Sequence, residues 1–242
     1  MNKLLYLLYF LREYLFPRGC GICGTMLVTQ AESWYGLCDE CRQDLDFDDD
    51  ERCDLCGRPL ISEIGRCLPC RNSAETVLQS CDMIISLYPY LGKYQKLLES
   101  FKFKKSLGTG HFLAEKVVEA LKLFPPDKVK DAVLVPVPPR PGKIRKTGWD
   151  QIACLSKLLR QRKDAPKIVR CLKKKKTESQ KKLDREDRKT NLKGRIFAKG
   201  KVPPNCILFD DVITTGSTID ACATALKQAG AEKVYGICLF YD

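Results

Sequence analysis

The stretch that decides the fold is ILFDDVITTGSTI, residues 207–219. Its first three residues are apolar and typical of a buried strand, and Asp210 and Asp211 follow them. A turn rich in hydroxyls and glycine comes next, and a helix is predicted to begin at Ser217 or Thr218. Such a turn presents backbone N–H groups and the positive end of a helix dipole, which suit a phosphate. The two carboxylates suit hydroxyl groups or Mg²⁺, so a sugar with vicinal hydroxyls and a 5-phosphate satisfies both halves.

This segment resembles the thirteen-residue signature with which type I phosphoribosyltransferases bind 5-phosphoribosyl-1-diphosphate (PRPP). The resemblance implies that Asp210 and Asp211 hold the ribose hydroxyls. It also implies that the turn holds the 5-phosphate through Thr214, Thr215, Gly216, Ser217 and Thr218. Walker B strands also end in acidic residues, but the chain has no GxxxxGK[ST] loop upstream. A solvated strand end followed by a capped helix is the remaining alternative.

Charge and cysteine content divide the 242-residue chain into two parts. Residues 1–75 hold 8 Lys and Arg against 13 Asp and Glu, so their net charge is −5, and the remainder must carry +17 to reach the overall +12. Eight of the fourteen cysteines lie before residue 71. We therefore expect a small N-terminal module over residues 1–75 and a larger domain over residues 76–242, with a boundary between Asn72 and Gln79.

The N-terminus contains a short apolar run at residues 4–11. A signal peptide would continue into a small-residue cleavage site, whereas Arg12-Glu13 and Phe16-Pro17 follow here. The run is also too short to span a bilayer. We expect an amphipathic helix packed on its own domain, with membrane association as the alternative, and no membrane span. The protein is expected in the cytoplasm, where its cysteines are reduced.

Four C-x-x-C pairs make up the cysteine-rich module, and a glycine follows the first and the third pair. Two such pairs supply the four thiolates that Zn²⁺ binds tetrahedrally. We favour sequential pairing into two structural sites, although an interleaved cross-brace would use the same ligands. Redox C-x-x-C motifs follow a strand at a helix start, whereas these pairs lie among polar turns. The expected zinc ligands are Cys20, Cys23, Cys38 and Cys41 in one site, and Cys53, Cys56, Cys67 and Cys70 in the other.

Beyond residue 80, apolar runs typical of strands alternate with helical periodicity. This alternation predicts an α/β domain with a mostly parallel sheet covered on both faces, and ligands at the carboxyl ends of its strands. His111, the single histidine, is expected to have no catalytic or ligand role. The expected strands are 84–88, 132–137, 207–209 and 234–240, and the expected helices are 94–101, 111–123, 151–160 and 217–229.

A proline-rich loop, residues 136–151, follows the second of these strands and carries several cations. A stiff cationic loop at a strand end suits a diphosphate, and an ordinary solvated loop is the alternative. The candidate diphosphate contacts are Arg140, Lys143 and Arg145.

The order of these features resembles ComF (ComFC/GntX-type) proteins over nearly the whole chain. The shared features are a cysteine module of four pairs, a PVP loop running to a GW-D-Q element, and the PRPP signature. Residues 177–197 also follow the family's Q-x-x-L…R-x-x-N…G-x-F pattern. Thr147 and Asp150 stand where the family's R-G-F-N-Q element has arginine and asparagine. The resemblance implies PRPP binding with Mg²⁺. It also implies a role in DNA uptake during natural transformation, with single-stranded DNA and a helicase or other uptake protein as partners.

Residues 173–201 concentrate positive charge, with thirteen Lys and Arg against four Asp and Glu. This segment can form a solvated hairpin, close over a polyanionic substrate, or follow a nucleic acid backbone. Its single aromatic residue is Phe197, so direct base recognition is not expected.

Three interpretations of function follow from the sequence. The first is a PRPP-binding protein that handles single-stranded DNA in uptake. The second is an active phosphoribosyltransferase of nucleobase or amine metabolism with no role on DNA, and the third uses the zinc module only as a docking surface. The sequence contains no evident general base, and it identifies no catalytic residue, acceptor, protein partner or oligomeric state.

Overall fold

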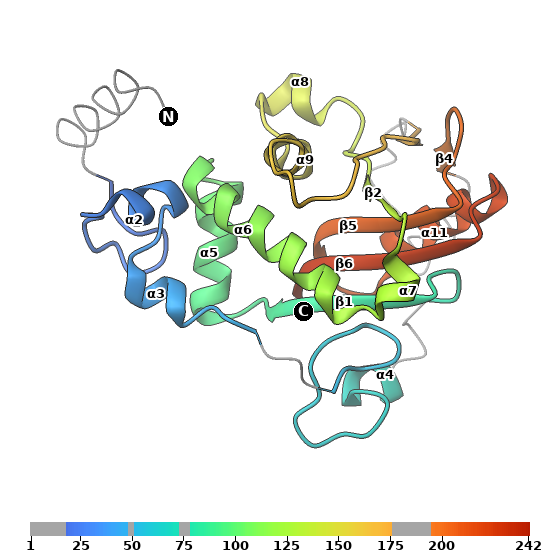
Figure 1. The fold of residues 1–242 in the computed structure, drawn as a ribbon, viewed down its shortest axis with the longest axis horizontal. Helices are drawn as coiled ribbons and strands as arrows, with labels where there is room; N and C mark the ends of the chain where they lie inside the picture. The colour runs from blue at the N-terminus through green and yellow to red at the C-terminus, as the bar shows by residue number, and fades with distance from the viewer. Residues whose placement is uncertain (1–17, 48–50, 73–77, 176–194) are drawn as a thin grey trace, which may run out of the picture.

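The computed structural model describes residues 18–47, 51–72, 78–175 and 195–242 (Figure 1). At its centre is a four-stranded sheet in the order β1-β6-β5-β2, and neighbouring strands are parallel throughout. The expected parallel α/β fold is therefore confirmed. The strands are β1 (Met83–Pro89), β2 (Val133–Pro136), β5 (Asn205–Ile213) and β6 (Lys233–Tyr241).

Strand β5 is longer than the apolar run that predicts it. Its expected end was Phe209, but the strand continues because its backbone stays paired with β6, with Asp210 opposite Cys238. Backbone pairing uses N–H and C=O groups, so polar side chains do not end it. Strand β2 ends at Pro136, opposite Phe209. Beyond Phe209, β5 is paired only with β6 among the described residues. Asp210 and Asp211 therefore lie past the end of β2, where one edge of β5 has no described strand beside it.

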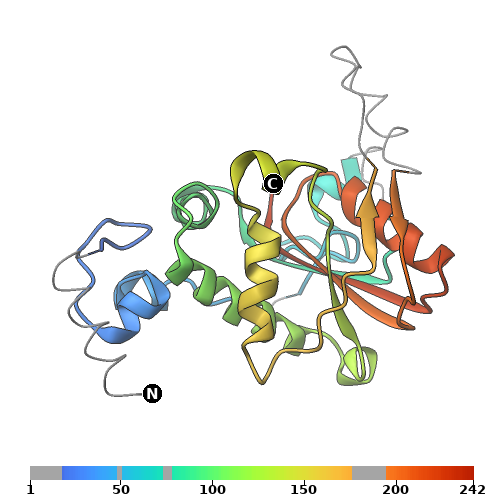
Figure 2. The same cartoon turned by 90° about the horizontal axis from the view of Figure 1, so that it is seen from above.

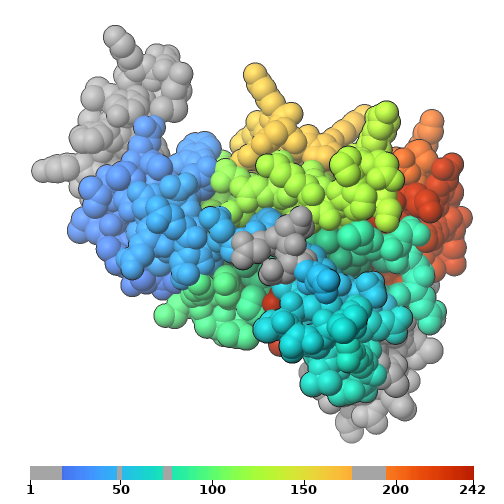
Figure 3. Space-filling model, turned by 60° about the horizontal axis from the view of Figure 1, so that its bottom comes forward, coloured from blue at the N-terminus to red at the C-terminus, as the bar shows by residue number. Residues whose placement is uncertain are grey.

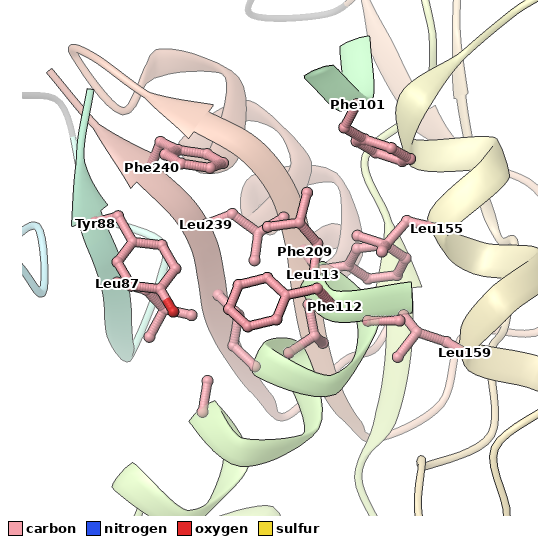
Figure 4. Close-up of a cluster of buried hydrophobic side chains, with 14 of the residues drawn as sticks. Leu87, Tyr88, Phe101, Phe112, Leu113, Leu155, Leu159, Phe209, Leu239 and Phe240 are labelled. Atoms are coloured by element: carbon pink, nitrogen blue, oxygen red, sulfur yellow. The ribbon is translucent and has the colours of Figure 1, made fainter. Parts of the chain in front are cut away.

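Helices cover both faces of the sheet, as Figure 2 shows. α6 (Leu107–Ala120) and α9 (Gln151–Arg160) pack on one face, and α11 (Ser217–Gln228) packs on the other. Alternate side chains of β5 enter these two cores, because successive strand residues point to opposite faces. Each fully buried Leu or Phe side chain contributes about 1.5–3 kcal/mol. The first core contains Phe112, Leu113, Leu155, Leu159 and Phe209 (Figure 4).

Local sequence sets where these helices begin. Asp150 caps α9, since its Oδ1 accepts a hydrogen bond from Ala153 N at 2.8 Å, and the helix occupies residues 151–160 as predicted. α6 begins earlier than expected because Ser106 caps it, its Oγ accepting from Thr109 N at 3.3 Å. The helix predicted at 111–123 also ends in a separate turn, η1 (Leu121–Leu123). α5 (Gly92–Lys102) covers the remaining predicted helix.

Short elements occur where the sequence indicated loops. α7 (Pro126–Val129) and α8 (Lys143–Thr147) are too short to show a periodic pattern. β3 (Leu172–Lys174) and β4 (Ile196–Ala198) pair antiparallel, and β4 packs on α11. Residues 176–194 connect β3 to β4 in the chain and are outside the described residues. Most of the predicted basic stretch falls in this range, as does most of the Q-x-x-L…R-x-x-N…G-x-F pattern.

The cysteine-rich part packs on the α/β body as two segments (Figure 3). The first cysteine segment, residues 18–47, contains α2 (Gln30–Tyr35) and α3 (Asp39–Gln43) and contacts α6, where Tyr35 donates to Glu115 at 2.7 Å. The second cysteine segment, residues 51–72, contains α4 (Leu68–Asn72) and lies against the β1 edge, where Ser86 N donates to Gly57 O at 3.0 Å.

Both cysteine segments share hydrophobic cores with the sheet. The predicted domain boundary near residue 75 lies within residues 73–77, and the predicted N-terminal helix lies within residues 1–17. Both ranges are outside the described part of the chain, so both stay predictions. Across the described residues, the structure has no helix with the length and apolarity to cross a membrane.

Candidate functional site

The eight expected zinc ligands gather into two groups of four. In each group the sulfur atoms lie within 4.8 Å of one another, and the groups follow sequential pairing, so the favoured arrangement is confirmed over the cross-brace. Cys23 Sγ lies 3.7 Å from Cys38 Sγ, and Cys56 Sγ lies 3.8 Å from Cys67 Sγ. A Zn–S bond near 2.3 Å gives a tetrahedron with edges of about 3.8 Å. Both groups therefore fit Zn²⁺.

The two sites are built on the same local plan, which explains why a glycine follows the first and the third C-x-x-C pair. Gly24 N donates to Cys20 O at 3.0 Å, and Gly57 N donates to Cys53 O at 2.9 Å. Both glycines have positive φ, +81° and +70°, so the tight turn after each first pair favours glycine. Bound zinc contributes folding free energy to such segments, which have little apolar core of their own.

The hydroxyl-rich turn, residues 214–218, lies between the end of β5 and the start of α11. Gly216 is the N-cap of α11 with φ +78°, and no side chain caps the helix. The first turn of a helix leaves N–H groups without intrahelical acceptors, and the helix dipole adds partial positive charge there. Thr215 Oγ1 and Ser217 Oγ lie 2.8 Å apart, and both residues reach the surface. Donors and hydroxyls thus converge on one solvent-facing turn, which suits an anion.

Asp211 is held by partners from two helices. Gln151, at the start of α9, donates its Nε2 to Asp211 Oδ2 at 2.6 Å, and Lys102 Nζ, at the end of α5, lies 3.8 Å from the same oxygen. Val212 N donates to Asp211 Oδ1 at 3.1 Å. The side chain is only 13% exposed, so these contacts fix the direction of its carboxylate. Gln151 itself accepts from Lys143 Nζ, at 2.5 Å, through Oε1.

Asp210 has different surroundings, because adjacent strand residues point to opposite faces. Burial raises its pKa well above the usual range, and the charge of neighbouring Asp211 raises the pKa further. Burial lowers the pKa of Lys174 on β3, whose charge interacts with those of Asp210 and Arg140. The two carboxylates also interact with each other, since Asp211 N donates to Asp210 Oδ1 at 2.9 Å.

A cationic groove adjoins this end of the sheet. It has a volume of about 740 Å³ and runs between the proline-rich loop and β3. Two of the three expected diphosphate contacts, Arg140 and Arg145, line it together with Lys173 and Lys174. Lys143 is elsewhere, bound to Asp150 Oδ2 at 2.8 Å and to Gln151.

Three residues near the candidate site were not identified from the sequence: Lys102, Gln151 and Lys174. Gln151 carried a signal, because it belongs to the GW-D-Q element quoted above. Asp150, noted as a departure from the family pattern, caps α9 and pairs with Lys143. His111 stacks on Trp34 with ring centroids 4.1 Å apart, so it joins α6 to the first cysteine segment.

Comparison with known proteins agrees with this architecture. The double zinc ribbon domain family matches residues 11–71. Competence protein F of Haemophilus influenzae is 28% identical over 207 residues, covering 82% of this chain and 87% of that protein. The chain is thus similar to competence protein F over most of the length of both proteins. This similarity, with the double zinc ribbon, bears out the ComF resemblance that the order of motifs indicated.

A shorter similarity links the chain to other proteins. Ribose-phosphate pyrophosphokinase 1 of Listeria monocytogenes is 48% identical over 48 residues, which cover 20% of this chain and 14% of that enzyme. Ribose-phosphate pyrophosphokinase 2 of Enterococcus faecalis is 44% identical over 48 residues, or 13% of its length. The chain spans only about a seventh of these enzymes, so the similarity concerns one segment and not the whole proteins.

Proposed function

We propose that this protein binds PRPP in the way the phosphoribosyltransferase signature implies. The 5-phosphate lies on the turn at residues 214–218, the ribose hydroxyls contact Asp210 and Asp211, and the diphosphate, with Mg²⁺, lies along Arg140 and Arg145. The observation that carries this proposal is the position of the turn. It opens at the helix N-terminus directly after the strand that bears both carboxylates. The short similarity to ribose-phosphate pyrophosphokinases supports the same choice of ligand.

Calorimetry with PRPP and Mg²⁺ tests this proposal through the double variant Asp210→Asn, Asp211→Asn. PRPP is an anion, so replacing carboxylates with amides removes electrostatic repulsion and by itself favours binding. A loss of affinity would therefore report lost contacts to the ribose hydroxyls. Hydrogen bonds to charged groups are each worth about 1.5–3 kcal/mol, so at least a tenfold loss is expected. The control is Asp164→Asn, an exposed aspartate paired with Arg162. Unchanged PRPP affinity in the double variant would remove the carboxylates from the proposal.

The alternative function is that of an active phosphoribosyltransferase, which would turn PRPP over. An active transferase would release diphosphate when an acceptor such as a nucleobase or an amine attacks C1 of PRPP. In that reaction the protein would act by positioning and by stabilising charge. Screening acceptors for diphosphate release tests this alternative, and release in the absence of any DNA would favour it.

We further propose that the protein acts on single-stranded DNA in DNA uptake, as the name of its Haemophilus relative suggests, with a helicase or another uptake protein as partner. Two exposed phenyl rings support a nucleic acid surface. Phe103 is 66% exposed and Phe197 is 37% exposed. Lys102 and Lys175 place ammonium groups 5.8 Å and 5.9 Å from these rings. Aromatic rings among cations suit stacking bases and a phosphate backbone. We propose that this activity takes place in the cytoplasm, where thiolate ligands of zinc stay reduced.

Fluorescence anisotropy with a labelled single strand, at two salt concentrations, tests the DNA proposal. Lys173→Glu with Lys175→Glu should weaken binding and flatten its dependence on salt, by about 0.7 in the logarithmic slope for each lost phosphate contact. The matched control reverses Lys128 and Lys130, near α7. Equal binding by both double variants would contradict a role for the described part of the basic stretch.

A further inference from the structure

The second cysteine segment reaches the start of the phosphate-binding turn through Arg58. Arg58 Nη2 donates to Asp242 O at 2.8 Å, and Asp242 N donates to Ile213 O at 3.0 Å. Ile213 is the last residue of β5 and directly precedes the turn. The Arg58 guanidinium also lies 4.7 Å from the centre of the Tyr241 ring, which fixes it over the end of β6. Two hydrogen bonds thus connect this segment to the residue before the turn.

The far side of the turn is held by residues that follow the same segment in the chain. A methyl group on Gly216 would lie 2.6 Å from Leu78 Cγ, so the Leu78 side chain packs directly on the Gly216 backbone. Asp220, one helical turn further along α11, accepts hydrogen bonds from Gln79 N at 2.7 Å and Ser80 N at 2.8 Å. These hydrogen bonds fix the backbone directly after Leu78 and so hold the Leu78 side chain against Gly216.

The second cysteine segment is itself rigidly placed. All four of its cysteines belong to the core that contains Leu78 and Ile219. A Cβ on Gly57 would lie only 2.0 Å from Ile84 O, so the backbone of the cysteine turn is in contact with β1. Ser86 Oγ donates to Cys56 O at 2.7 Å at the same place. The segment, through Arg58, and the residues that follow it, through Leu78, therefore offer a fixed support for the two ends of the turn.

We propose that the second cysteine segment is a structural part of the PRPP site, in which Arg58 and Leu78 are positioning residues for the turn that binds the 5-phosphate. This inference rests on the proposed function. The first cysteine segment contacts α5, α6 and Tyr88 of β1, and it packs into the core on the other face of the sheet. The two zinc sites then differ in their effect on PRPP binding. Only the second one supports ligand binding.

Calorimetry with PRPP and with ribose 5-phosphate tests this division in the full-length protein. Arg58→Met removes the hydrogen bond to Asp242 and keeps an apolar stem. The matched control is Arg42→Met in the first cysteine segment, where Arg42 stacks 5.2 Å from the Tyr35 ring. Arg58→Met should weaken both ligands about tenfold, corresponding to roughly 1.4 kcal/mol, while Arg42→Met leaves both unchanged. Arg58→Lys, which keeps a donor, should recover part of the loss. Zinc content and the unfolding midpoint without ligand are measured for each variant.

Leu78 supplies a second, independent variant. Leu78→Ala should weaken both ligands, whereas Leu78→Met, which conserves volume, should retain most of the affinity. If wild-type protein does not bind PRPP, the proposed function and this inference both fall. If wild-type protein binds PRPP while Arg58→Met and Leu78→Ala bind ribose 5-phosphate equally well, the inference alone is overturned. A loss in Arg42→Met as large as in Arg58→Met, with zinc retained, would also overturn it.

Discussion

Replacing Gly216 with alanine adds one methyl group to the turn, and the structure separates its cost into two parts. The first is backbone strain, because φ is +78° and a non-glycine residue in this region costs about 1–2 kcal/mol. The second is overlap, because the new Cβ would lie 2.6, 2.7 and 2.9 Å from three carbons of Leu78. Overpacking of this kind costs about 1–3 kcal/mol. The total expected loss of folding stability is roughly 2–5 kcal/mol.

Gly142 is a matched control for this substitution. It is also a helix N-cap, with φ +79°, and a Cβ there would meet no atom within 4 Å. Gly142→Ala should therefore show the backbone cost alone. Thermal unfolding followed by circular dichroism measures both variants, and each kcal/mol is worth about 2–4 °C at this chain length. Leu78→Ala should also cost less in the Gly216→Ala background than in the wild type, because it relieves the overlap. Equal losses for Gly216→Ala and Gly142→Ala would refute the packing of Leu78 on the turn.

Three further predictions concern Gln151, Asp210 and zinc. Gln151→Leu should weaken PRPP binding about tenfold by calorimetry, because Asp211 loses the 2.6 Å hydrogen bond that directs it; an unchanged affinity would show that Asp211 needs no such support. Burial raises the folded-state pKa of Asp210, so the wild type loses stability as pH rises from about 4, where the unfolded carboxyl ionises, toward the folded pKa. Asp210→Asn should therefore melt higher than the wild type at pH 7, and the gap should close toward pH 4; a constant gap would contradict the pKa shift. Two zinc ions per chain are expected by mass spectrometry, and chelation should unfold the cysteine segments, since zinc supplies about 10–16 kcal/mol in comparable peptides; a content near one would remove one of the two sites.

Local signals were sufficient for much of the fold. The period of apolar residues placed α9 at residues 151–160, and the C-x-x-C pairs favoured the ligand grouping that the structure has. The end of β5 could not be located in this way. It depends on backbone pairing with β6, which continues through two carboxylates that carry no strand signal.

Much of the candidate site depends on tertiary structure and was beyond sequence reasoning for that reason. The contact of Asp211 with Gln151 joins residues 60 positions apart, and it exists because α9 begins beside the open end of β5. The packing of Leu78 on Gly216 likewise requires the chain after the second cysteine segment to return to α11. A motif identifies which residues bind a ligand, whereas the residues that hold the motif in place come from other parts of the chain.

An experimental structure of the protein with PRPP and Mg²⁺ bound is the most direct test of the central claim. The account predicts the 5-phosphate at the N-terminus of α11, within hydrogen-bonding distance of backbone N–H groups between Thr215 and Thr218, and the ribose hydroxyls at the carboxylates of β5. A 5-phosphate located instead in the groove beside Arg140 and Lys174, with the turn unoccupied, would contradict it.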